Sequence, residues 1–149
     1  MIYVNTNIGE YYLDMIEGRE PVFEISRYHY KVYSYLKNGV YTMGPMGSTG
    51  KTLLKRVLSE YKRLGEPVGA IDSVEATEFN GISHRVPENC RLFLIDRYNL
   101  PMPNIDKDIK KLSKTGVVLI DCKGQNGLDI SGVADILRPN ATEFYIIDW

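Results

Sequence analysis

Five short apolar runs follow one another along the chain, and three of them are unbroken rather than alternating. The runs are Val40–Met43, Pro67–Ile71, Arg91–Asp96, Val117–Asp121 and Glu143–Asp148. Unbroken apolar strands are typical of a parallel sheet covered by helices on both faces, because neither face then meets water. The pattern therefore predicts a three-layer α/β fold with a mainly parallel sheet of about five strands.

The segments between these runs contain two patterns with helical period. Lys51–Leu64 places apolar side chains on one face and five charged ones, Lys55 among them, largely on the other. A glycine and a proline follow it, as expected at a helix end. Asn104–Lys114 predicts a second helix with Asn104 as its cap. Residues 73–90 are polar and irregular, which predicts a loop or a short helix.

The first 38 residues differ from the rest of the chain because they are rich in tyrosine and have no clear period. They hold Tyr3, Tyr11, Tyr12, Tyr28, Tyr30, Tyr33 and Tyr35. Ser26–Lys37 is compatible with a capped helix, whereas the spacing of its tyrosines alternates as in a strand, so both readings stay open. We expect one domain, 1–149, made of a tyrosine-rich N-terminal segment, 1–38, and an α/β core, 39–149.

Composition narrows the class of protein. Hydrophobic residues make up 44% and charged residues 25% of the chain, and the formal net charge is -1. These values are ordinary for a globular domain and give no overall electrostatic signal for nucleic acid. No apolar run of about 18 residues and no signal peptide is visible, so we expect no membrane span. Cys90 and Cys122, with only two histidines, do not form a zinc motif, and we expect reduced thiols in a cytoplasmic protein.

A glycine-rich loop lies between the first apolar run and the best helix. Residues 44–52 read Gly-Pro-Met-Gly-Ser-Thr-Gly-Lys-Thr. Glycines let backbone N–H groups turn inward around an anion, and the helix that follows adds its positive end. The predicted phosphate-binding residues are Gly47, Ser48, Thr49, Gly50, Lys51 and Thr52. Pro45 stands where the usual pattern has its first glycine, and the alternative is a structural turn without a ligand.

With this loop and the run Arg91–Asp96, residues 39–148 resemble the P-loop NTPase superfamily. The resemblance implies that Lys51 contacts the β- and γ-phosphates and that Thr52 and Asp96 hold Mg²⁺. Asp72 and Asp121 also end strands, but Asp96 is preferred because its run is the most apolar; the alternative is that Asp96 ends a buried strand and caps a loop. No guanine-specific Asn-Lys-x-Asp motif is present, which favours ATP.

The order of runs is similar to that of the AAA+ and RecA-like branch, which has an extra strand between the loop strand and the Walker B strand. In that branch a γ-phosphate sensor often ends the neighbouring strand, where Asp121-Cys122-Lys123 stands here. A glutamate often follows the Walker B aspartate, but Arg97 occupies that position, and no helical lid follows the last strand. The catalytic residues are then Lys51 and Asp96, and the candidates for a water-orienting base are Asp72, Glu75 and Glu78. We expect slow or partner-dependent ATP hydrolysis.

Two other functions fit the same residues. A small-molecule or nucleotide kinase would need no water-orienting glutamate, although residues 122–140 contain only one arginine, Arg138. A non-catalytic interaction module would explain Pro45 and Arg97. Tyrosines of the N-terminal segment are candidates for stacking on a base, for contacts with a protein partner or a second copy, and, with Arg27 and Lys31, for binding single-stranded nucleic acid.

Overall fold

The computed structural model describes residues 2–5, 10–13, 20–28, 31–43, 51–97, 103–121 and 141–145. In chain order the elements are β1 (Ile2–Asn5), β2 (Glu10–Leu13), β3 (Phe23–Ile25), β4 (Lys31–Ser34), β5 (Gly39–Met43), α1 (Lys51–Arg63), β6 (Val68–Asp72), α2 (Ser73–Glu78), the 3-10 helix η1 (Ser83–Arg85), β7 (Leu92–Asp96), α3 (Pro103–Leu112), β8 (Val117–Asp121) and β9 (Ala141–Tyr145). Within these ranges no helix has the length and apolar character needed to cross a membrane.

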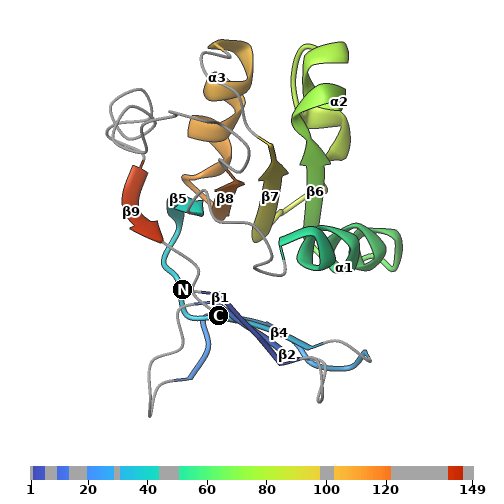
Figure 1. The fold of residues 1–149 in the computed structure, drawn as a ribbon, viewed down its shortest axis with the longest axis vertical. Coiled ribbons are helices and arrows are strands. Elements are labelled where there is room, and N and C mark those ends of the chain that lie inside the picture. Colours follow the sequence, from blue (N-terminus) through green and yellow to red (C-terminus); the bar gives the residue numbers. More distant parts are fainter. Residues whose placement is uncertain are drawn as a thin grey trace.

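The larger sheet has five strands in the order β6-β7-β8-β5-β9 (Figure 1). Every pair of neighbours in it is parallel. The α/β class and the mainly parallel sheet predicted from the apolar runs are therefore confirmed. The last strand begins two residues earlier than expected, at Ala141. The helices α1 and α3 match the two helical patterns, and α2 and η1 lie within the polar region 73–90.

Successive side chains of the strands enter two different apolar clusters, one on each face of the sheet. In β7, Leu92 and Leu94 belong to the first cluster, whereas Phe93 and Ile95 belong to the second. All five residues of β7 and all five of β8 are buried. The unbroken apolar runs thus have a direct cause, because side chains on both faces are covered.

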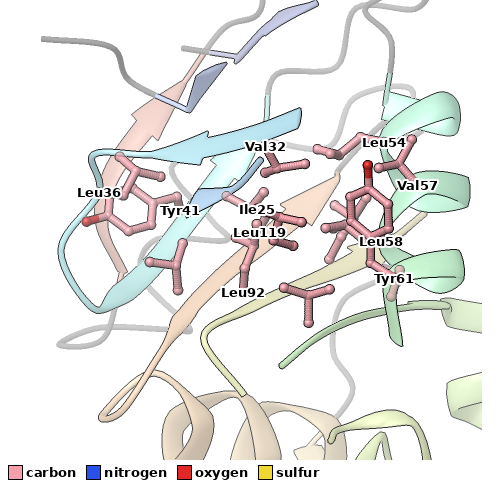
Figure 2. Close-up of a cluster of buried hydrophobic side chains, with 14 residues drawn as sticks. Ile25, Val32, Leu36, Tyr41, Leu54, Val57, Leu58, Tyr61, Leu92 and Leu119 are labelled. Carbon is pink, nitrogen blue, oxygen red and sulfur yellow. The ribbon is translucent and has the colours of Figure 1, made fainter. Parts of the chain in front are cut away.

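Helix α1 and part of the N-terminal segment cover the first face together. Leu54 and Leu58 of α1, Val32 of β4 and Leu92 of β7 meet in one cluster (Figure 2). Leu54, Leu58, Val32 and Leu92 are all fully buried. The apolar face of α1 predicted from its period is therefore the face that packs on the sheet.

The second face is covered by α2, η1 and α3. Ala76 of α2, Ile82 next to η1, and Ile105 and Ile109 of α3 belong to the same buried cluster as Phe93 of β7. The result is a three-layer arrangement, with α1 and the small sheet on one side and the other helices on the opposite side. In Figure 1, β1, β2 and β4 lie at the opposite end of the molecule from α2 and α3.

The N-terminal segment forms a small mixed sheet in the order β1-β2-β4-β3. β1 and β2 are antiparallel, β2 and β4 parallel, and β3 and β4 antiparallel. A helix over Ser26–Lys37 is therefore wrong. In β4, Val32 and Ser34 are buried while Lys31 and Tyr33 are half-buried, which is the two-residue period of a strand with one face on a core.

A buried carboxylate joins this small sheet to the far end of α1. Glu66 is only 8% exposed and accepts hydrogen bonds from Arg27 Nε at 2.9 Å and from the Tyr28 hydroxyl at 3.3 Å. The ring of Tyr28 lies 4.9 Å from that of Tyr61 on α1. The charged pair and the two rings hold the segment before β4 against the helix.

We predict that Gly116→Ala lowers the free energy of unfolding by about 1–3 kcal/mol, the usual cost of overpacking a core. A Cβ atom on Gly116 would lie 2.6 Å from the carbonyl oxygen of Cys90, a backbone atom that cannot swing aside. Urea unfolding measures the difference. Thr115→Ala, at the exposed neighbouring position, is the control. Equal stability of the Gly116 variant and the wild type would contradict this packing.

Candidate functional site

Three aspartates lie side by side where parallel strands end. Asp72 of β6 pairs with Asp96 of β7, and Met43 of β5 pairs with Asp121 of β8. The residues just before Asp96 and Asp121 are also paired, so these two aspartates are neighbours. Ligands of open parallel sheets bind outside the carboxyl ends of the strands, which is the edge formed here.

The glycine-rich segment 44–50 connects two elements at this edge. β5 ends there at Met43, and α1 begins at Lys51. The predicted phosphate-binding residues Gly47, Ser48, Thr49 and Gly50 lie outside the described residues, as does Lys123. Lys51 and Thr52 form the start of α1, although the description does not extend to their side chains.

Lys55 reaches from α1 to two of the three aspartates. Its Nζ atom lies 3.4 Å from Oδ2 of Asp72 and 3.4 Å from Oδ2 of Asp96. The helical period placed Lys55 with the charged residues of α1, and it gave no sign of this contact. The sequence feature that could have indicated this contact is the spacing of the two lysines. Lys55 follows Lys51 by four residues and so lies on the same side of the helix.

Asp96 is ionised at neutral pH in spite of its burial. Burial alone would raise the pKa of its carboxyl group. A hydrogen bond with Asp121 and the positive charges of Lys55 and Arg97 outweigh burial, so the pKa of Asp96 lies below its ordinary value. The edge therefore holds a carboxylate whose charge is already balanced.

Arg97 follows Asp96 with an unusual backbone conformation. Its φ is 55°, in the left-handed region that residues other than glycine seldom adopt. This turn takes the chain out of β7 directly after the carboxylate. The exposed Arg97 side chain adds positive charge near Asp96 but offers no base.

Two of the three base candidates have different surroundings. Asp72 caps α2, because its Oδ1 accepts a hydrogen bond from the backbone N–H of Val74 at 2.8 Å. Its other oxygen faces Lys55. Glu78 is exposed in the last turn of α2. Of these two, only Asp72 lies at the strand edge, and both of its oxygens already have partners.

The third candidate, Glu75, belongs to an ion-pair group on the surface of α2 and η1. Arg85 donates from Nε to Oε2 at 2.7 Å and from Nη2 to Oε1 at 2.6 Å. His84 Nε2 lies 3.2 Å from Oε2. The hydrogen bonds from Arg85 lower the pKa of Glu75 to about 2. Such a weak base is poorly suited to orient or deprotonate water.

Tyr28, one of the candidates for stacking on a base, lies far from the start of α1. It packs on Tyr61, which follows Lys51 by ten residues. At 1.5 Å per residue this separation is about 15 Å along the helix. The ring of Tyr28 is used in holding the small sheet against α1, and it does not face the aspartate edge.

The aspartate edge offers one side chain suited to Mg²⁺. This ion prefers oxygen ligands, usually one or two carboxylates with water and phosphate, and Asp96 supplies an ionised carboxylate. Within the described residues, no three His, Cys, Asp or Glu side chains are grouped so as to hold a metal by themselves. Asp96 could therefore supply one protein ligand to such an ion, with water or phosphate oxygens in the other positions.

A broad groove of about 700 Å³ lies at the other end of the strands. It runs between α3 and the segment around η1, and its lining includes Ile82, Val86, Cys90, Asp108 and Lys111. Burial raises the pKa of the Cys90 thiol to about 11, so this thiol is unreactive at neutral pH. The groove lies beside the amino end of β7, away from Asp96.

No protein family model matches this chain. No curated protein matches it, and no solved structure matches it.

We predict that Glu75→Gln lowers stability at neutral pH by up to about 1 kcal/mol, the scale of a partly exposed ion pair. The pKa of Glu75 falls on folding, so its contribution is complete above the unfolded value near 4.5 and is lost as the pH falls towards about 2. Urea midpoints between pH 7 and pH 3 test this. Glu78→Gln is the matched control on the same helix, and a constant difference across that range would contradict the prediction.

Proposed function

We propose that this chain is a P-loop domain that binds Mg-ATP at the aspartate edge and hydrolyses it slowly or only with a partner. The observation that carries the proposal is the position of Asp96. It ends a buried parallel strand, at the same edge where β5 leads into the glycine-rich segment and α1 begins. The chain thus joins a phosphate-loop sequence to a carboxylate at one edge of a sheet.

The order of strands supports the same proposal. β8 lies between β5, the strand before the loop, and β7, the strand that ends in Asp96. An extra strand in this position is the feature expected for the AAA+ and RecA-like branch.

In the proposed site each residue type has a defined task. Backbone N–H groups of residues 47–50 surround the phosphates, and Lys51 offsets their charge. Thr52 and Asp96 would hold Mg²⁺, which supplies charge neutralisation on the β- and γ-phosphate oxygens when bound. Asp121, hydrogen-bonded to Asp96, keeps the Asp96 carboxylate at the strand edge.

Slow ATP hydrolysis is expected because the carboxylates that could act as the base at this edge are already bound to other groups. Glu75 is held by Arg85, and both oxygens of Asp72 are engaged. None of the three base candidates therefore offers an unengaged carboxylate at this edge. A water molecule near the γ-phosphate would lack a base among them. The same geometry is compatible with transfer to another acceptor, so phosphate release and transfer should be assayed together.

We predict that Lys51→Ala weakens ATP binding about 10- to 100-fold, the loss expected for a charged hydrogen bond of about 1.5–3 kcal/mol. Titration with a fluorescent ATP analogue in the presence of Mg²⁺ measures the affinity. Arg56→Ala removes an exposed positive charge from the same helix and is the matched control. Absence of binding by the wild type at millimolar nucleotide would refute the proposed function for the isolated chain.

We also predict that Asp96→Asn removes most of the Mg²⁺ enhancement of ATP binding while leaving metal-free binding nearly unchanged. The substitution keeps the shape of the side chain and removes the charge that a hard cation requires. Binding isotherms with Mg²⁺ and with EDTA separate the two effects. An unchanged Mg²⁺ enhancement would mean that Asp96 is not a metal ligand.

A further inference from the structure

Lys55 has an environment that the proposed site does not use. Its ammonium lies between two carboxylates of different strands, 3.4 Å from each. The exposed fractions of the three side chains are 29% for Lys55, 23% for Asp72 and 9% for Asp96. The pairing is thus partly shielded from water, where a charge interaction is stronger than at an open surface.

The distances from Lys55 Nζ to the two carboxylates show that it interacts with both of them equally. A charge-assisted N–H···O bond is usually about 2.7–2.9 Å long, so neither contact has closed to that length. Lys55 instead bridges Asp72 and Asp96 and balances both of them. A lysine ammonium is a compact charge on a flexible stem and can move away from such a position without rearranging the backbone.

The position of Lys55 on α1 ties this charge to the predicted phosphate loop. Lys51 begins α1, and Lys55 stands one turn later. Phosphate groups bound at the start of the helix would attract the same ammonium that now faces the carboxylates. Asp96 is the carboxylate that binds Mg²⁺ in the proposed function.

We propose that Lys55 is a positioning residue that serves as the resident counter-ion of Asp72 and Asp96, and that Asp96 must leave Lys55 in order to bind a divalent cation. This inference rests on the proposed function. Lys55 thereby sets the concentration of metal ion that the site requires. It keeps Asp72 and Asp96 in place in the metal-free protein and makes them weak ligands until a nucleotide attracts the ammonium.

The test measures metal binding without nucleotide, so that it is separate from ATP affinity. Mn²⁺ is titrated into the full chain, and free Mn²⁺ is followed by electron paramagnetic resonance. Removing one positive charge next to the ligand should strengthen binding at least about tenfold in Lys55→Met. Lys55→Arg keeps the charge and should bind Mn²⁺ nearly as the wild type does. In Lys55→Met with Asp96→Asn, the gain should disappear.

Thermal unfolding monitored by circular dichroism provides a second readout. Lys55→Met leaves two carboxylates without their counter-ion and should unfold at a lower temperature than the wild type. Mg²⁺ should restore more of this loss than NaCl of equal ionic strength does. If Lys55→Met does not fold, Lys55→Gln takes its place, because it keeps a polar donor of similar length.

The two proposals fail in different ways. If Lys55→Met and Lys55→Gln bind Mn²⁺ no more tightly than the wild type, the counter-ion role of Lys55 is overturned even where ATP binds through Lys51. If the gain in Mn²⁺ affinity appears and depends on Asp96, the counter-ion role is supported, even where the ATP titration fails.

Discussion

Burial of both faces of one parallel sheet is the constraint on which the rest of the molecule depends. The interior positions of β7 and β8 are apolar because side chains on both faces are covered. Charged groups on these strands are therefore confined to the strand ends. Asp96 and Asp121 lie there, next to Asp72 of β6. The same rule that builds the core thus gathers three carboxyl groups in one row.

A row of acidic groups at the edge of a core needs compensation. Lys55 supplies it from α1, and Arg97 supplies it from the turn after β7. Together these positive charges balance the buried carboxylate of Asp96. In the proposed function, this balance would make Asp96 a weak ligand for free metal ions until a nucleotide binds.

Much of the core could be predicted from the sequence, because its signals are local and redundant. The strand within Arg91–Asp96 is predicted by its unbroken apolar run, and α1 is predicted by the helical period of its apolar residues. The strands β1, β2 and β3 were missed. β4 was one of two open readings, because its tyrosine spacing suits a strand as well as a capped helix. The contacts of Lys55 and the capture of Glu75 by Arg85 were also missed. Both depend on which side chains the tertiary fold brings together.

The small sheet also belongs to the core. Ile25 and Val32 of the small sheet, and Leu36 just after it, are buried in the cluster that includes Leu54 and Leu58, and Arg27 pairs with Glu66 beside them. A partner that displaced this segment, or a protease that removed it, would expose the apolar side chains of this cluster to water. The strands β3 and β4 are therefore a built-in part of the core, because their removal would expose the apolar side chains of α1 and the large sheet that they cover.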